Sequence, residues 1–354
     1  MTNVAFGVVR ALDYLSIALV VGTLVFIARV TPPALRGGAF ERRAWVLLGG
    51  GLALGVAVSV LGILLQGAEA SGLSLWRSLK PAVVSNVLST RFGWVWAVRA
   101  GLLAVSLATL GLRRRRALRV WLRGVCGYLV ATPALGGHAS VQSPVWVFLP
   151  ADVAHVLAAS VWVGGIVCIV FALPLATRAV EPAARTGVLV DVLGRFSPLA
   201  LSAVAVIALT GIVQAYIEVR SLHALTHSTY GELVLAKTGL LGLLIGLGTI
   251  NRERVIPALR RLLIAGSTPG EMGVLLRRST LGELAAMACV FAATAALLAF
   301  TPPIQAAGDT RGPAPPSRVG VRRAPRPSHT STQAARIAAA SRRPAIARRP
   351  MPVA

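Results

Sequence analysis

The sequence contains a succession of apolar runs of about 20 residues, each long enough to cross the ~30 Å hydrocarbon core of a bilayer as an α-helix. Hydrophobic residues make up 55% of the 354-residue chain and charged residues only 14%, which excludes an ordinary soluble domain. Because lipid offers the backbone no hydrogen-bond partners, only helices and closed barrels cross it, and runs of this length are typical of helices. The sequence therefore predicts an all-α, polytopic membrane helical bundle.

We expect about eight transmembrane helices. Their expected ranges are 8–30, 44–66, 93–112, 119–136, 150–174, 196–217, 231–250 and 284–303. The first run is expected to remain as a span and not to be cleaved as a signal peptide, because it continues to about Val30 and carries Asp13. Residues 304–354 are rich in Pro, Ala, Ser and Arg and poor in large apolar side chains, so they are expected to form a disordered tail.

The distribution of arginine predicts the orientation of the helices. Arginines gather in the connections after the first, third, fifth and seventh spans, whereas the connection with His138 carries no charge. The positive-inside rule then places both termini, the His138 loop and the loop with His223 and His227 on the extracytoplasmic side. Since loops and tail account for the net charge of +24, we expect no nucleic-acid partner. The loop arginines are Arg36, Arg42, Arg43, Arg113 to Arg116, Arg178, Arg185, Arg252, Arg254, Arg260, Arg261, Arg277 and Arg278.

The two halves of the chain resemble each other. The third span begins T-R-F-G with Arg99 six residues after its glycine, and the seventh begins S-T-Y-G with Lys237 at the same offset. Aligning Gly22 with Gly164 places Asp13 opposite His155. These matches predict two parallel four-helix repeats, 1–137 and 138–303, related by an axis along the membrane normal.

Polar side chains concentrate near the expected outer ends of the spans, and we call this set the outer polar cup. It comprises Asp13, Gln66, Glu69, Arg99, Asp152, His155, Gln214, Glu218 and Lys237, with His138 in the adjoining loop. We expect no matching set of acids or histidines at the inner ends, where the helices are almost wholly apolar. Buried charges need partners, so one interpretation is two internal ion pairs, Asp13 with Arg99 and Asp152 with Lys237. The alternative is that Arg99 and Lys237 tune a nearby ligand set.

Asp152 and His155 lie three residues apart and therefore share one helix face. Ionisable residues inside a span mark functional sites by default, although a lone histidine in a helix is often a satisfied interior group. Imidazole and carboxylate suit divalent transition metals, copper(II) among them. We therefore expect His138, Asp152 and His155 to ligate a metal, with Asp152 either binding directly or orienting the ring of His155. His223 and His227, four residues apart, are a weaker candidate pair that requires a helix there.

Several motifs in the second half carry a family resemblance. They are G-G-H-A-S, then P-A-D-V-A-H-V-L-A-A-S-V-W-V-G-G, R-F-S-P-L-A, T-G-I-V-Q-A and T-Y-G-E-L-V-L-A-K-T-G-L-L. In this order they are similar to the copper resistance protein D (CopD) family, most strongly over residues 130–255. The resemblance implies an eight-helix protein of the bacterial inner (plasma) membrane that functions in copper uptake or homeostasis. It also implies that copper arrives from outside, often from a CopC-like copper-binding domain that is fused or encoded nearby.

The leading functional hypothesis is a copper permease that imports copper captured at the outer site; the lipid bilayer and the copper ion are its expected partners. The alternatives are a membrane redox or assembly factor, either a haem protein or a helper that delivers copper to an extracytoplasmic oxidase, and a non-catalytic scaffold. We expect no enzymatic activity and no nucleotide, because the sequence has no GxxxxGK[ST] loop. Haem is not expected, because His155 alone is clearly inside a span and bis-histidine ligation needs two.

Overall fold

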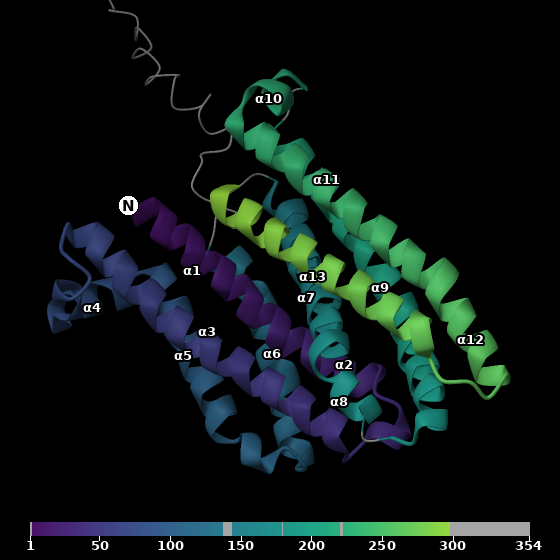
Figure 1. Cartoon of the computed structure of the whole chain (residues 1–354). Helices are drawn as coiled ribbons and strands as arrows, with labels where there is room; N and C mark the ends of the chain where they lie inside the picture. Colours follow the sequence, from purple (N-terminus) through teal and green to yellow (C-terminus); the bar gives the residue numbers. More distant parts are fainter. Residues whose placement is uncertain (1, 137–143, 179, 220–221, 298–354) are drawn as a thin grey trace, which may run out of the picture. The chain divides into compact units, whose positions relative to one another are not determined.

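The computed structural model describes residues 2–136, 144–178, 180–219 and 222–297, and this part of the chain is helical throughout apart from short turns (Figure 1). His138 and the expected tail, 304–354, lie outside the described residues. The α-helices are α1 Thr2–Ile17, α2 Thr23–Arg29, α3 Ala39–Ser71, α4 Pro81–Leu88, α5 Arg91–Ala108, α6 Arg116–Gly136, α7 Val145–Phe171, α8 Leu173–Arg178, α9 Pro182–Val219, α10 Leu222–His227, α11 Thr229–Ile250, α12 Ile256–Ile264 and α13 Gly270–Leu297. π-Helical turns at Ala18–Gly22 and Asn251–Val255 join α1 to α2 and α11 to α12.

Seven helices of the described part are long and apolar enough to cross a membrane, which agrees with the expected polytopic helical bundle. Within the described residues, each of the expected spans overlaps one or more helices, and the first of these helices begins before the expected range. The fourth expected span coincides with α6, which has 21 residues but is not among the seven. Arg119 and Arg123 lower the hydropathy of α6. That α6 crosses the membrane, which would bring the number of spans to eight, stays a prediction. The seven helices are Val4–Arg29, Ala39–Ser71, Arg91–Ala108, Val145–Phe171, Ala184–Ile217, Thr229–Ile264 and Gly270–Ala296.

The two halves meet where the π-helical turn after α1 packs on α7 (Figure 1). A Cβ atom on Gly22 would strike the Ser160 carbonyl oxygen and the Gly164 Cα atom, and one on Gly164 would strike the Ala18 carbonyl oxygen. The backbones can therefore approach this closely because both residues are glycine. The contact is reciprocal under the alignment of Gly22 with Gly164, as a two-fold relation requires, while the division into two repeats stays a prediction.

The matching motifs T-R-F-G and S-T-Y-G form the same local structure. Thr90 caps α5 by accepting a hydrogen bond from the Gly93 amide at 3.1 Å, and Ser228 caps α11 by accepting one from the Gly231 amide at 3.0 Å. A hydroxyl at this position satisfies one of the amides that a helix start leaves without a partner. Arg99 and Lys237 consequently lie at the same distance from the starts of their helices.

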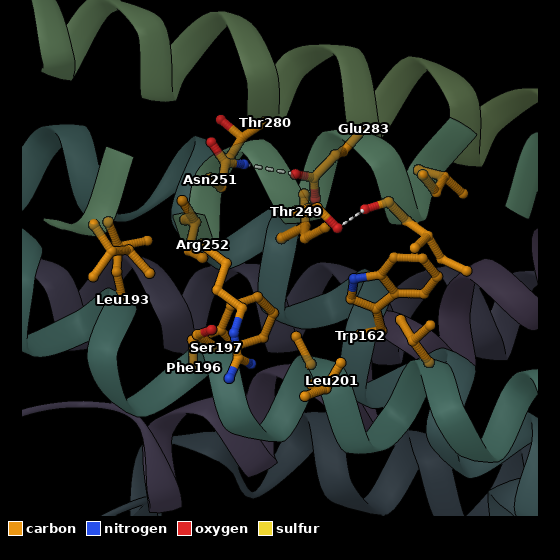
Figure 2. A pocket seen from close by; sticks show the side chains of 18 of the residues that line it. Trp162, Leu193, Phe196, Ser197, Leu201, Thr249, Asn251, Arg252, Thr280 and Glu283 are labelled. Carbon is orange, nitrogen blue, oxygen red and sulfur yellow. Dashed lines mark hydrogen bonds between the residues drawn. The ribbon is translucent and has the colours of Figure 1, made fainter. Parts of the chain in front are cut away.

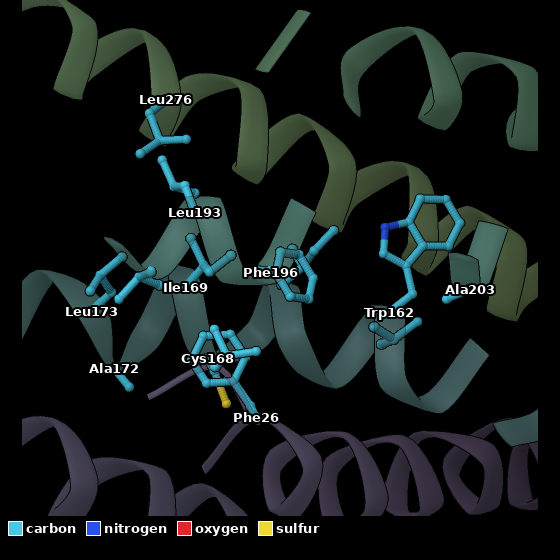
Figure 3. Close-up of a cluster of buried hydrophobic side chains, with 14 of the residues drawn as sticks. Phe26, Trp162, Cys168, Ile169, Ala172, Leu173, Leu193, Phe196, Ala203 and Leu276 are labelled. Atoms are coloured by element: carbon cyan, nitrogen blue, oxygen red, sulfur yellow. The ribbon is translucent and has the colours of Figure 1, made fainter. Parts of the chain in front are cut away.

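A large apolar cluster joins α2 and α7 to α9 and α13 (Figure 3). The ring of Phe26 lies 5.8 Å from that of Phe196, centroid to centroid, and a side chain at Gly165 would overlap the Phe196 ring. Trp162 and Leu276 belong to the same buried cluster. The cluster fixes α7 and α9 side by side, and this packing sets the positions of the polar residues that the two helices carry.

Candidate functional site

His155 projects from α7 onto α9, and its orientation is fixed by Thr210. The imidazole Nδ1 lies 2.9 Å from the Thr210 hydroxyl oxygen. That hydroxyl donates its hydrogen to the Val206 carbonyl at 2.6 Å, so it accepts a hydrogen bond from Nδ1–H. The proton of a neutral ring is thereby held on Nδ1, and the lone pair on Nε2 is available to a metal. This arrangement is the one that metal-ligating histidines adopt.

Asp152 lies one turn before His155 and is held by the next turn of α9. The side-chain amide of Gln214 donates a hydrogen bond to Oδ1 of Asp152 at 3.2 Å. Since Gln214 follows Thr210 by four residues, both lie on one face of α9, opposite the face of α7 that carries Asp152 and His155. The structure therefore brings together the two expected ligands of the second half. It also assigns a partner to Gln214, a residue expected at the outer side, and a role to Thr210, which the sequence pattern did not indicate.

Lys237 on α11 acts electrostatically on His155. The polar residues around His155 therefore come from three helices, α7, α9 and α11. The residue aligned with Arg99 thus lies near the residue aligned with Asp13, as the internal repeat predicts. The pairing of Lys237 with Asp152 stays a prediction. We call Asp152, His155, Thr210, Gln214 and Lys237 the second-half cluster.

The equivalent positions of the first half form a closed ion pair. Asp13 on α1 and Arg99 on α5 are 5% and 1% exposed and form a salt bridge, which confirms that expected pairing. Arg99 also donates a hydrogen bond to the Ser16 hydroxyl at 3.3 Å, and its guanidinium lies 5.7 Å from the centre of the Trp96 ring. Because the two charges neutralise each other, Asp13 and Arg99 are not available as an ion site. This distinguishes them from the aligned residues of the second half, His155 and Lys237.

The other expected ligands and supporting polar residues lie only partly within the described residues. Glu69 is exposed near the end of α3, and the side chain of Glu218 lies outside the described residues, as does His138. His223 and His227 do lie on a helix, α10, where their exposed rings stack with centroids 4.3 Å apart. No group of three or more His, Cys, Asp or Glu side chains within the described part is arranged to hold a metal. The ligation of a metal by His138, Asp152 and His155 therefore stays a prediction.

A polar group at the other end of the bundle was missed by the sequence analysis. A cavity of about 120 Å³ lies between α7, α9, α11 and α13, and both Asn251 and Glu283 line it (Figure 2). The Asn251 amide donates a hydrogen bond of 2.7 Å to the Glu283 carboxyl group, which is 4% exposed. We expected no matching set of acids or histidines at the inner ends, and Glu283 is a single buried acid that this expectation did not anticipate. Asn251 and Glu283 each lie one residue outside an expected span, at 231–250 and 284–303, so they were assigned to loops.

Comparison with known proteins places the chain in one family. Two family models match, "Copper resistance protein D-like, N-terminal domain" over residues 1–146 and "Copper resistance protein D" over residues 190–297. The chain is 32% identical to "Copper resistance protein D" of Pseudomonas syringae pv. tomato over 247 residues, covering 66% of this chain and 77% of that protein. It is 30% identical to "Copper transport protein CutJ" of Bacillus subtilis (strain 168) over 250 residues, covering 68% of this chain but only 45% of that relative's length. No solved structure matches. The chain belongs to the copper resistance protein D family.

Proposed function

We propose that the protein is a copper permease of the bacterial plasma membrane, which takes up copper from the extracytoplasmic side and carries out no covalent catalysis. Family membership supports a role in copper handling, as do the names of the two relatives, one a copper transport protein and the other a copper resistance protein. Copper is the transported substrate in this proposal. A CopC-like protein is the expected donor on the outer side.

The orientation of His155 carries the proposal. Because Thr210 holds Nδ1, the Nε2 atom presents a lone pair on the helix face that also carries Asp152. An imidazole and a carboxylate together suit copper(II). His138 and non-protein ligands are the candidates for the remaining coordination positions. Lys237 places a positive charge near the ring, which favours release once the ion has been captured.

Replacement of His155 by Ala is expected to abolish copper uptake. The measurement is copper accumulation in cells that lack the gene and carry either the wild type or His155→Ala at matched membrane expression. Leu157→Ala is the control, since Leu157 is an exposed residue of the same helix and is expected to leave uptake unchanged. Equal accumulation with His155→Ala would contradict the capture site. A fall in oxidase activity without any change in cell copper would favour the assembly role, and a Soret band in the purified protein would favour haem.

Thr210→Val is expected to weaken copper binding about 10- to 100-fold, because loss of the group that orients a ligating histidine has effects of that size. The valine keeps the shape of threonine but removes the oxygen that accepts from Nδ1. Thr238→Val is the matched control: Thr238 makes the same bond to its own helix, at 2.9 Å to the Val234 carbonyl, and is exposed. Copper titration of both purified variants checks this prediction, and equal affinities would refute it.

A further inference from the structure

The cavity at the end of the bundle opposite the second-half cluster is built from four helices (Figure 2). Each helix contributes the part that is distant from the cluster: α7 from Trp162 onward, α9 up to Val204, α11 from Leu244 onward, and the first half of α13. Arg252 also lines the cavity, and the arginine-rich connection around α12 lies at this end. By the positive-inside rule, this is the cytoplasmic end.

Apolar and aromatic side chains line most of the cavity, and a single hydrogen-bonded pair supplies its polar centre. Figure 2 shows Glu283 and Asn251 facing one another, with the bond from the Asn251 amide nitrogen to the Glu283 carboxyl oxygen drawn between them. Asn251 begins the π-helical turn Asn251–Val255. Such turns occur often at functional sites. A volume of about 120 Å³ also leaves room for a few water molecules beside the pair.

The side-chain oxygen of Asn251 has no partner within the described part of the chain. This atom, Oδ1, is fully buried and accepts no hydrogen bond from the described residues. The two nearby threonines of the lining do not supply one, because the Thr249 hydroxyl donates to the Ile245 carbonyl at 2.8 Å and the Thr280 hydroxyl to the Leu276 carbonyl at 2.9 Å. A buried acceptor without a donor is costly and requires an explanation.

A protonated Glu283 supplies the missing donor. A carboxylic acid and an amide form two complementary hydrogen bonds: N–H to one carboxyl oxygen, and the acid O–H to the amide oxygen. The first bond is present, and the second requires only a proton on the other oxygen of Glu283. An isolated buried carboxylate is strongly disfavoured, so the neutral acid is the form that this environment stabilises. The neighbouring positive charge of Arg252 and the presence of one carboxyl group disfavour a divalent cation in its place.

We propose that Glu283 is a proton-binding site at the cytoplasmic end of the bundle, and that Asn251 acts as its hydrogen-bonding partner in both protonation states. The proton comes from cavity water, forms the O–H bond on Glu283 and donates to Oδ1 of Asn251; it returns to water when the carboxylate is hydrated. The second part of the proposal rests on the proposed permease function. It is that this proton exchange at Glu283 accompanies the movement of copper through the protein.

Few other charges among the described residues bear on the titration of Glu283. The lining residues from α7 and α9 carry no ionisable group, and Arg252 is the ionisable neighbour from the π-helical turn, with its Nε 3.6 Å from Glu253. On α13 itself, Glu271, Arg277 and Arg278 are exposed. Asp13, another buried carboxyl group of the described part, is paired with Arg99, so the pH-dependent signal that is assigned to Glu283 is the one lost on its replacement by glutamine.

Infrared difference spectroscopy of the purified, full-length protein tests the proton site directly. On lowering the pH, the wild type is expected to gain the C=O band of a buried protonated carboxyl group, and Glu283→Gln is expected to lose this band. Glutamine reproduces both hydrogen bonds of the acid form, so this variant is expected to fold. Glu271→Gln, which replaces an exposed glutamate on the same helix, is the control and should retain the band.

With Asn251→Leu, the C=O band of Glu283 is expected to shift to higher frequency because its hydrogen bonds are lost. Absence of the band from the wild type, or its persistence in Glu283→Gln, would overturn the proton site.

Copper uptake into proteoliposomes tests the coupling separately. An imposed pH gradient is expected to change the initial rate of uptake by the wild type and by Glu271→Gln, whereas Glu283→Gln loses this response. An equal response of Glu283→Gln and the wild type would overturn the coupling. If the wild type moves no copper while its infrared band is present, the permease function fails and the proton site stands.

Discussion

Asp13→Asn is expected to lower the free energy of unfolding by about 3–5 kcal/mol, the usual effect of removing one partner from a buried ion pair. Arg99 is 1% exposed, forms a salt bridge with Asp13, donates a hydrogen bond to Ser16 and lies over the Trp96 ring. Asparagine keeps the size of the side chain but leaves the guanidinium charge without a counter-charge in an apolar bundle. Thermal unfolding of the detergent-solubilised protein, followed by circular dichroism, measures the loss.

The exposed pair Asp191 and Arg195 provides the matched control. These residues lie at i, i+4 on α9 with 3.9 Å between their charged atoms, and their side chains are 56% and 44% exposed. Asp191→Asn should therefore change stability by less than about 1 kcal/mol. Combining Asp13→Asn with Arg99→Gln is expected to recover part of the loss, because it removes the unpaired charge. Equal stabilities of Asp13→Asn and Asp191→Asn would show that the buried pair is not a structural tie between α1 and α5.

Gly164→Leu is expected to destabilise the protein by about 3 kcal/mol or more, at or above the upper end of the usual cost of overpacking. A Cβ atom at Gly164 meets the Ala18 carbonyl oxygen and the Gly22 Cα atom, and backbone atoms cannot turn aside as the tip of a side chain can. The helices of the two halves would have to separate at their crossing. The same thermal unfolding experiment measures the loss.

Gly242→Leu on α11 is the control for the crossing, because a Cβ atom there meets nothing within 4 Å and Gly242 is exposed. We expect it to leave the unfolding temperature within experimental error. Similar unfolding temperatures for Gly164→Leu and Gly242→Leu would mean that the close approach of Gly22 and Gly164 does not hold the two halves together.

Much of the fold was predictable because membrane helices can be recognised from local composition. The apolar runs located the long helices, and the spacing of Gly93 to Arg99 and Gly231 to Lys237 correctly indicated equivalent helix starts. The pairing of Asp13 with Arg99 was also predictable, since two opposite charges at one depth of an apolar bundle need each other. The helix boundaries were predicted poorly. For this reason Asn251 and Glu283 each fell one residue outside an expected span.

A hydropathy average assigns Glu283 and the preceding arginines to a loop, because one charge lowers the average of a short window. The structure instead begins α13 at Gly270 and packs it on α11, so Glu283 is carried into the bundle. Asn251 likewise continues α11 through a π-helical turn that no composition signal marks. Whether a polar residue near a helix end faces water or a partner depends on packing, which a single chain's sequence does not display.

The sequence by itself determined that this chain is a helical membrane protein, roughly where its long apolar helices lie, and that several of the ionisable residues there come in a repeated pattern. These properties follow from the cost of placing charges and unpaired backbone groups in lipid, which each segment meets locally. The tertiary structure alone decided the partners: Thr210 and Gln214 for the candidate ligands, Asn251 for Glu283, and Gly164 for Gly22. Those contacts join residues far apart in sequence, so their geometry exists only once the helices are packed.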